Sequence, residues 1–102
     1  MEKIIKTWGY ELVIQNNKKY CGKILFFEKG KKGSLHYHKL KEESWYINEG
    51  KFLITIENEI LLAEKGMTIN IPPYTKHQVE ALEEGSIFEI STQHFDEDTY
   101  RI

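Results

Sequence analysis

Turn-forming residues interrupt this chain so often that no long helix fits between them. Glycines, prolines, asparagines and small clusters of charged residues separate short runs rich in Ile, Leu, Val, Phe, Tyr and Thr, and none of these runs shows the 3.6-residue apolar repeat of a helix. Short runs of β-branched and aromatic residues favour strands. The expected strands cover residues 10–15, 20–28, 35–39, 43–48, 51–57, 67–71, 78–82 and 86–92. This pattern predicts an all-β sandwich or barrel, with a polar tail over 94–102 that either wraps back over it or frays.

Composition narrows the class of protein further. The chain has 102 residues, 40% of them hydrophobic and 29% charged, which is typical of one globular domain over residues 1–102. Its net charge is −2, and Lys and Arg are scattered among Glu, so we expect no nucleic-acid partner. No apolar run approaches the ~20 residues of a membrane span, and charges occupy the start where a secretory signal would be apolar. The single Cys21 has no partner for a disulfide. We therefore expect a cytoplasmic protein with no membrane partner.

Four residues have the chemistry of a metal site: His36, His38, Glu43 and His77. His36 and His38 are two residues apart, so on a strand both side chains leave the same face. Three imidazoles and one carboxylate suit a first-row divalent ion. The expected cofactor is therefore one divalent transition metal, which could be Mn, Fe, Co, Ni or Zn.

Strand parity predicts which side chains surround this site. If Glu43 faces the interior, Trp45 and Ile47 do too, and they form an apolar wall beside the metal. The same alternation turns Ser34 inward and turns Leu35, Tyr37 and Tyr46 outward. Residues 24–27 and 45–47 are apolar on both faces, so one face needs a cover besides the second sheet. We expect a second copy of the chain there, which makes the protein a homodimer.

The spacing of these residues resembles that of the cupin superfamily. The pattern from Gly30 to Gly50, with His36, His38 and Glu43 between them, meets every fixed position of the first cupin motif. The second motif is met by Gly66, Pro72 and His77, and it departs at Tyr74, where the family has glycine, and at Ala81, where it has asparagine. The resemblance implies a single-domain jelly-roll barrel of six to eight strands, with the metal near its wider mouth.

A closer resemblance covers most of the chain. The segments 7–11, 30–45 and 97–101 are similar to the C-terminal cupin domain of type II mannose-6-phosphate isomerases, although His36 stands where those enzymes usually have Gln. Because the nucleotidyltransferase domain of those enzymes is missing from this sequence, the chain looks like a stand-alone relative. The resemblance implies a metal-dependent isomerase of a sugar or sugar phosphate, which would be its small-molecule partner.

An isomerase of this kind needs more than a metal. Four protein ligands leave one or two positions open on a five- or six-coordinate ion, so the ion can polarise substrate oxygens. A base must also move a proton between neighbouring carbons. Glu89 is the first candidate for that base, ahead of His94 and Lys76, and Arg101 is a candidate to hold a phosphate.

Two other functions are compatible with the same residues. The same three histidines and one glutamate suit an Fe(II)-dependent dioxygenase of small molecules, and the ligand set does not separate it from an isomerase. A non-catalytic cupin that binds a sugar or regulates in response to one is the third reading, because one barrel serves many functions.

Overall fold

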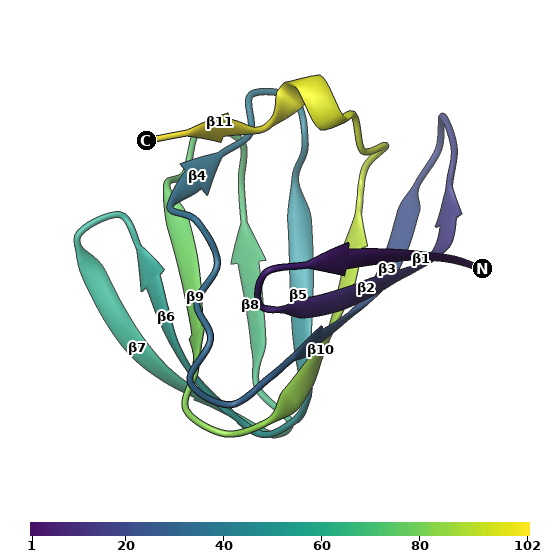
Figure 1. The fold of residues 1–102 in the computed structure, drawn as a ribbon. Helices are drawn as coiled ribbons and strands as arrows, with labels where there is room; N and C mark the ends of the chain where they lie inside the picture. The colour runs from purple at the N-terminus through teal and green to yellow at the C-terminus, as the bar shows by residue number, and fades with distance from the viewer.

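The computed structural model covers residues 1–102 and shows two antiparallel sheets that face each other as an open barrel (Figure 1). The strand order is β1-β2-β3-β10-β5-β8 in one sheet and β11-β4-β9-β6-β7 in the other. The bounds are β1 Glu2–Lys6, β2 Gly9–Asn16, β3 Cys21–Phe27, β4 His36–Tyr37, β5 Glu43–Glu49, β6 Lys51–Ile56, β7 Glu59–Glu64, β8 Thr68–Ile71, β9 His77–Ala81, β10 Gly85–Ser91 and β11 Tyr100–Arg101. The all-β fold class expected from the sequence is confirmed.

The sequence pattern found eight of these strands and missed three. β1 is rich in charge, and β7 is an edge strand whose Ile60 and Leu62 face solvent, so neither has a clear apolar–polar alternation. β11 forms only by pairing with β4, where Tyr100 lies opposite Tyr37. The expected strand over 35–39 is reduced to the two residues of β4. The tail therefore wraps back across the barrel, as Figure 1 shows.

Helical structure is confined to one short turn. η1, a 3-10 turn over Asp96–Asp98, precedes β11. No helix in the structure has the length and apolarity needed to cross a bilayer.

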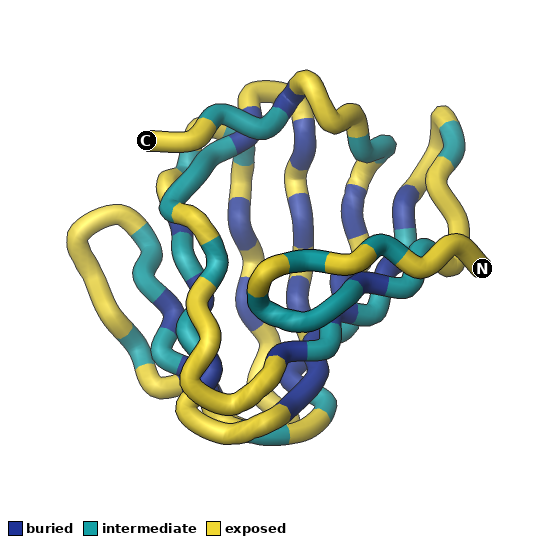
Figure 2. The backbone as a smooth tube through the Cα atoms, in the orientation of Figure 1, coloured by how far each residue is buried: buried dark blue, intermediate teal, exposed yellow.

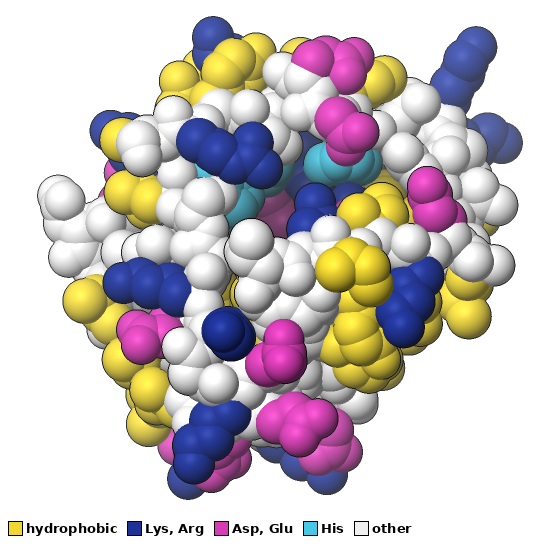
Figure 3. All heavy atoms as spheres, in the orientation of Figure 1, with side chains coloured by type: hydrophobic (Ala, Val, Ile, Leu, Met, Phe, Trp, Pro, Cys, Tyr) yellow, Lys and Arg dark blue, Asp and Glu magenta, His cyan; other side chains and the backbone are white.

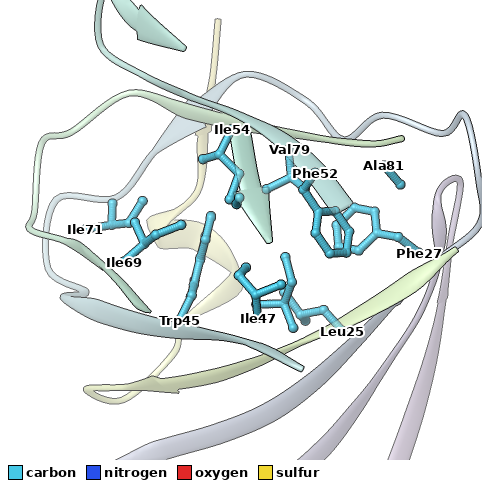
Figure 4. Close-up of a cluster of buried hydrophobic side chains, with 12 residues drawn as sticks. Leu25, Phe27, Trp45, Ile47, Phe52, Ile54, Ile69, Ile71, Val79 and Ala81 are labelled. Carbon is cyan, nitrogen blue, oxygen red and sulfur yellow. The ribbon is translucent and has the colours of Figure 1, made fainter. Parts of the chain in front are cut away.

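Apolar side chains from both sheets fill part of the barrel. Buried and exposed residues alternate along the strands (Figure 2), and the inward set includes Trp45 and Ile47, while Tyr46 is 40% exposed. The predicted parity of β5 is therefore confirmed. Phe27 and Phe52 meet edge to face with ring centroids 5.5 Å apart, and Ile47 lies beside them in the same cluster (Figure 4). Cys21 is fully buried, and burial raises the pKa of its thiol.

The apolar filling stops part of the way along the barrel. On neighbouring strands Leu25, Ile87 and Ile47 lie side by side and form one apolar row. Two residues further along, the row is Lys23, Glu89 and Trp45. The interior therefore changes from apolar to polar along β3 and β10, and the polar end is where the cavity lies.

Candidate metal centre

The fold brings the four predicted ligands together at the polar end of the barrel. His36 on β4 lies opposite His77 on β9, and His38 follows the end of β4. Ring nitrogens of these three histidines all lie within 4.8 Å of one another. Glu43, the first residue of β5, places its Oε2 atom 3.3 Å from His38 Nε2 and 3.6 Å from His77 Nε2. Four residues that lie far apart in the sequence thus converge on one point.

Backbone carbonyls fix the protonation of all three rings. The Nδ1 atoms lie at hydrogen-bonding distance from carbonyl oxygens: His36 with Ser34 at 2.9 Å, His38 with Asp98 at 3.0 Å and His77 with Thr75 at 2.8 Å. A carbonyl oxygen only accepts hydrogen bonds, so each Nδ1 carries the proton and donates it. In the neutral ring this tautomer leaves the lone pair on Nε2. This is the arrangement in which a histidine ligates a metal through Nε2.

Two buried atoms at the convergence point have no partner in the protein. They are Glu43 Oε2 and His77 Nε2, and both are sealed from solvent. The other carboxylate oxygen of Glu43 accepts a hydrogen bond from Trp45 Nε1 at 2.7 Å, so the side chain is held in place. An unpartnered buried oxygen and nitrogen that face each other are costly unless a cation lies between them. The donor set therefore fits a divalent transition metal.

The electrostatics keep these groups in their ligating forms. Burial, together with the nearby His77, lowers the pKa of His36 to about 4, and burial also lowers the pKa of His77. Burial alone would raise the pKa of Glu43, but the close approach of His38 and the charge of Lys41 outweigh it and lower that pKa. At neutral pH His36 and His77 are therefore neutral and the glutamate is ionised, as metal binding requires.

A cavity of about 560 Å³ opens onto the metal centre. Figure 3 looks into this hollow, where histidine, acidic and basic side chains are visible below the rim. Both predicted catalytic residues line it, Glu89 inside and the exposed Arg101 at the edge. His94 also lines the cavity, whereas Lys76 is exposed and is not among the residues that line it.

Glu89 is buried and paired with a lysine. Its Oε2 atom accepts a hydrogen bond from Lys41 Nζ at 3.1 Å. Burial and the negative charge of Glu43 raise the pKa of Glu89, and Lys41 offsets part of that rise. Arg101 on β11 forms no ion pair within the protein, so its guanidinium is free to bind a ligand.

Sequence reasoning missed two residues that hold this centre together. Lys41 lies between Glu89 and Glu43, with its Nζ 3.9 Å from Glu43 Oε1 and 3.2 Å from His94 Nδ1. Its position two residues before Glu43 was a signal that it faces inward. Asp98, in η1, accepts hydrogen bonds from three successive backbone amides, those of residues 39, 40 and 41. No local pattern points to Asp98, because its partners are nearly 60 residues away along the chain.

The departure from the second cupin motif at Tyr74 is visible in the backbone. Tyr74 has φ of 66°, the left-handed conformation that glycine adopts most easily. Its backbone amide donates to the carbonyl of His38 at 2.6 Å, and its ring stacks against Tyr37 with centroids 6.5 Å apart. The tyrosine therefore holds, with some backbone strain, a conformation that glycine would adopt without it.

The antiparallel barrel and the histidines and glutamate that converge inside it are the fold and the donor set of a β-barrel that could hold a metal ion. The family model described as a cupin domain matches residues 24–91, and the chain belongs to this family. The superfamily resemblance seen in the sequence is therefore confirmed.

Among known proteins, the chain is 49% identical over 51 residues to an uncharacterized protein of Methanocaldococcus jannaschii. That match covers 50% of this chain and 41% of the relative. A mannose-1-phosphate guanylyltransferase of Sinorhizobium fredii is 29% identical over 76 residues, which is 74% of this chain and 15% of the enzyme. A putative mannose-1-phosphate guanylyltransferase of Vibrio cholerae is 28% identical over 75 residues, which is 74% of this chain and 16% of that protein. The chain thus spans less than half the length of these curated relatives.

Solved structures confirm the fold at low identity. An RmlC-like cupin from Shewanella frigidimarina superposes with a TM-score of 0.85 at 20% identity, covering 94% of this chain and 86% of that one. KdgF from Halomonas sp. superposes with a TM-score of 0.80 at 20% identity, covering 86% of this chain and 81% of KdgF. Oxalate decarboxylase of Bacillus subtilis gives 0.87 at 18% identity and covers 99% of this chain but 30% of that one.

Proposed function

We propose that this protein is a metal-dependent isomerase of an open-chain sugar or sugar phosphate. One observation carries the proposal: the ligand set lies in the same cavity as Glu89, a buried carboxylate whose pKa is raised. Two relatives are named for an enzyme of mannose 1-phosphate, which supports a role near sugar-phosphate chemistry. The cytoplasmic location and the absence of nucleic-acid and membrane partners remain predictions.

The metal would be held by His36, His38, Glu43 and His77. Bound there, a divalent ion would supply the positive charge that polarises a carbonyl oxygen and makes the neighbouring C–H more acidic. The protein's own contribution begins with orientation, because each imidazole is locked by the hydrogen bond at its Nδ1 atom.

Glu89 would act as the base that moves a proton between the two carbons. Its raised pKa brings the carboxylate closer to neutral pH, which favours both accepting and returning a proton. Lys41 holds one oxygen of Glu89 at 3.1 Å, so the second oxygen is the one directed to the substrate. Arg101 at the rim would then bind a phosphate at the far end of the molecule through its planar fork of donors.

The test is turnover by the full chain loaded in turn with Mn, Fe, Co, Ni and Zn. Aldoses and their 6-phosphates would be incubated with each form, and the matching ketoses measured by chromatography. We expect conversion without oxygen uptake. Glu89→Gln should lose at least a hundredfold in rate while keeping its metal.

Two results would contradict the proposal. Oxygen consumption by the Fe(II) form with a small-molecule substrate would make the protein a dioxygenase. Thermal stabilisation by a sugar without any turnover, in every metal form, would make it a binding or regulatory cupin.

A further inference from the structure

A buried ion pair lies inside the barrel on the wall formed by β2 and β3. Lys23 Nζ is 3.2 Å from Glu11 Oε1, and the two residues are 5% and 7% exposed. Neither residue is among the predicted metal ligands. Lys23 also lies directly opposite Glu89 on β10, and Glu11 lies one diagonal step away on β2, so the ammonium of Lys23 has a carboxylate on each neighbouring strand.

Stability alone does not explain this pair. Removing two charges from water is expensive, and a well-packed apolar pair in the same place is often as stable or more stable. The next pair along β3 and β10 is apolar, with Leu25 opposite Ile87, whereas on β2 Glu11 lies opposite Leu25 and reaches diagonally to Lys23. The polar row lies where the cavity begins, which favours a ligand as the reason for its charges.

Glu11, Lys23 and Glu89 have hydrogen-bond donors and acceptors that the protein does not use. An ammonium group has three donor hydrogens, and within the protein Lys23 donates to Glu11 alone. Glu11 Oε2 and Glu89 Oε1 accept no hydrogen bond from the protein, and neither is among the sealed, unpartnered atoms. All three residues line the cavity. Lys41 differs, since it already contacts Glu89, His94 and Glu43.

The unused donors of Lys23 and the free carboxylate oxygens of Glu11 and Glu89 determine which ligand chemistry fits here. A compact anion needs donors alone, and the two free carboxylate oxygens would repel it. A hydroxyl group both donates and accepts, so neighbouring hydroxyls can donate to the two carboxylates and accept from the ammonium between them. We propose that Glu11 and Lys23, next to the proposed base Glu89, form a subsite for the hydroxyl groups of a polyhydroxylated carbon chain. This inference rests on the proposed function in that it names the substrate class of the same cavity.

A hexitol tests the subsite without requiring turnover. Mannitol has the hydroxyls of a hexose chain and no carbonyl group, so it is not a substrate for isomerisation. The zinc-loaded full chain would be labelled with ¹⁵N and titrated with mannitol in ¹H–¹⁵N correlation spectra. We expect saturable shifts at the amides of β2, β3 and β10 and at the indole of Trp8, which also lines the cavity.

Matched variants separate the subsite from a general effect. In the double variant Lys23→Met, Glu11→Leu we expect mannitol affinity to fall at least tenfold, with a melting temperature equal to or above that of the wild type. The control is Lys65→Met, which removes the lysine of an exposed ion pair with Glu49. It should bind mannitol as the wild type does.

Several outcomes would overturn the subsite: no saturable shifts, equal affinity in the double variant, or a dicarboxylate such as malonate binding to these strands more tightly than mannitol. A collapse of the melting temperature in the double variant would also overturn it, because the pair would then serve the fold. Mannitol binding without isomerase turnover in any metal form refutes the proposed function and keeps the subsite. Isomerase turnover without mannitol binding refutes the subsite and keeps the proposed function.

Discussion

Replacing Asp98 by Asn should weaken both the fold and the metal centre. Asp98 is 4% exposed, and its carboxylate accepts from the backbone amides of residues 39, 40 and 41 at 2.9–3.2 Å. Its backbone carbonyl also orients His38 at 3.0 Å. The carboxylate therefore ties the loop that follows β4 to the C-terminal segment. That loop leads from one metal ligand, His38, to the next, Glu43.

The expected loss of stability follows from the number of hydrogen bonds that the Asp98 carboxylate accepts. Hydrogen bonds to a charged group contribute about 1.5–3 kcal/mol each. An asparagine keeps one carbonyl oxygen and turns an NH₂ group towards a backbone amide, so it loses at least one of these bonds. We expect the free energy of unfolding to fall by about 2–3 kcal/mol. We expect metal affinity to fall about tenfold to a hundredfold, as when other groups that orient metal ligands are removed.

The assay pairs urea unfolding with a metal competition titration. Asp96→Asn is the matched control, because the Asp96 side chain is 98% exposed two residues away and should change stability by less than about 0.5 kcal/mol. The reasoning is refuted if Asp98→Asn unfolds at the same urea concentration as the wild type and binds zinc with unchanged affinity.

Three further predictions test other parts of the structure. Tyr74→Gly should raise the free energy of unfolding by up to about 1 kcal/mol in urea titrations, because glycine adopts φ of 66° without strain; a loss of stability would mean that the stack on Tyr37 outweighs the strain. Tyr46 and Phe88 lie on the outer face of the first sheet, with ring centroids 6.1 Å apart. Tyr46→Ser should therefore shift the expected homodimer towards monomer in light scattering while the metal content stays the same. Metal loss with an intact dimer would contradict this prediction. Burial and the charge of Lys41 lower the pKa of His94 to about 4, so the folded state holds a proton there less readily than the unfolded chain. The stability that His94 contributes is complete above pH 6.5 and is lost as the pH falls towards 4. In urea titrations the free energy of unfolding of His94→Gln should therefore rise relative to that of the wild type as the pH falls over this range. Parallel pH profiles of the two proteins would refute this prediction.

The metal ligands could be predicted because their spacing is set locally. Strand parity links His36 to His38 and Glu43 to Trp45. The pairing of β4 with β9 then brings in His77, and Glu43 meets the histidines from β5 in the facing sheet. The inward side of β5 followed from the same rule and is confirmed.

The charged interior could not be predicted in the same way. Lysines are rarely buried, so Lys23 and Lys41 read as surface residues even though parity places Lys23 on the same face as Cys21 and Leu25. Their burial depends on carboxylates contributed by other strands. Asp98 is a harder case still, because its role exists only once the C-terminal segment has crossed the barrel.

The central claim is that the three histidines and Glu43 hold one divalent metal, and metal content tests it most directly. Natively purified protein would be analysed by mass spectrometry beside His77→Ala and the control His94→Ala, which removes a histidine outside the ligand set. We expect about one equivalent of Mn, Fe, Co, Ni or Zn in the wild type and in the control, and little in His77→Ala. Wild-type protein that is free of metal and does not bind added metal would show that these residues do not form a metal site. His77→Ala protein that retains full metal stoichiometry would show that His77 is not a ligand.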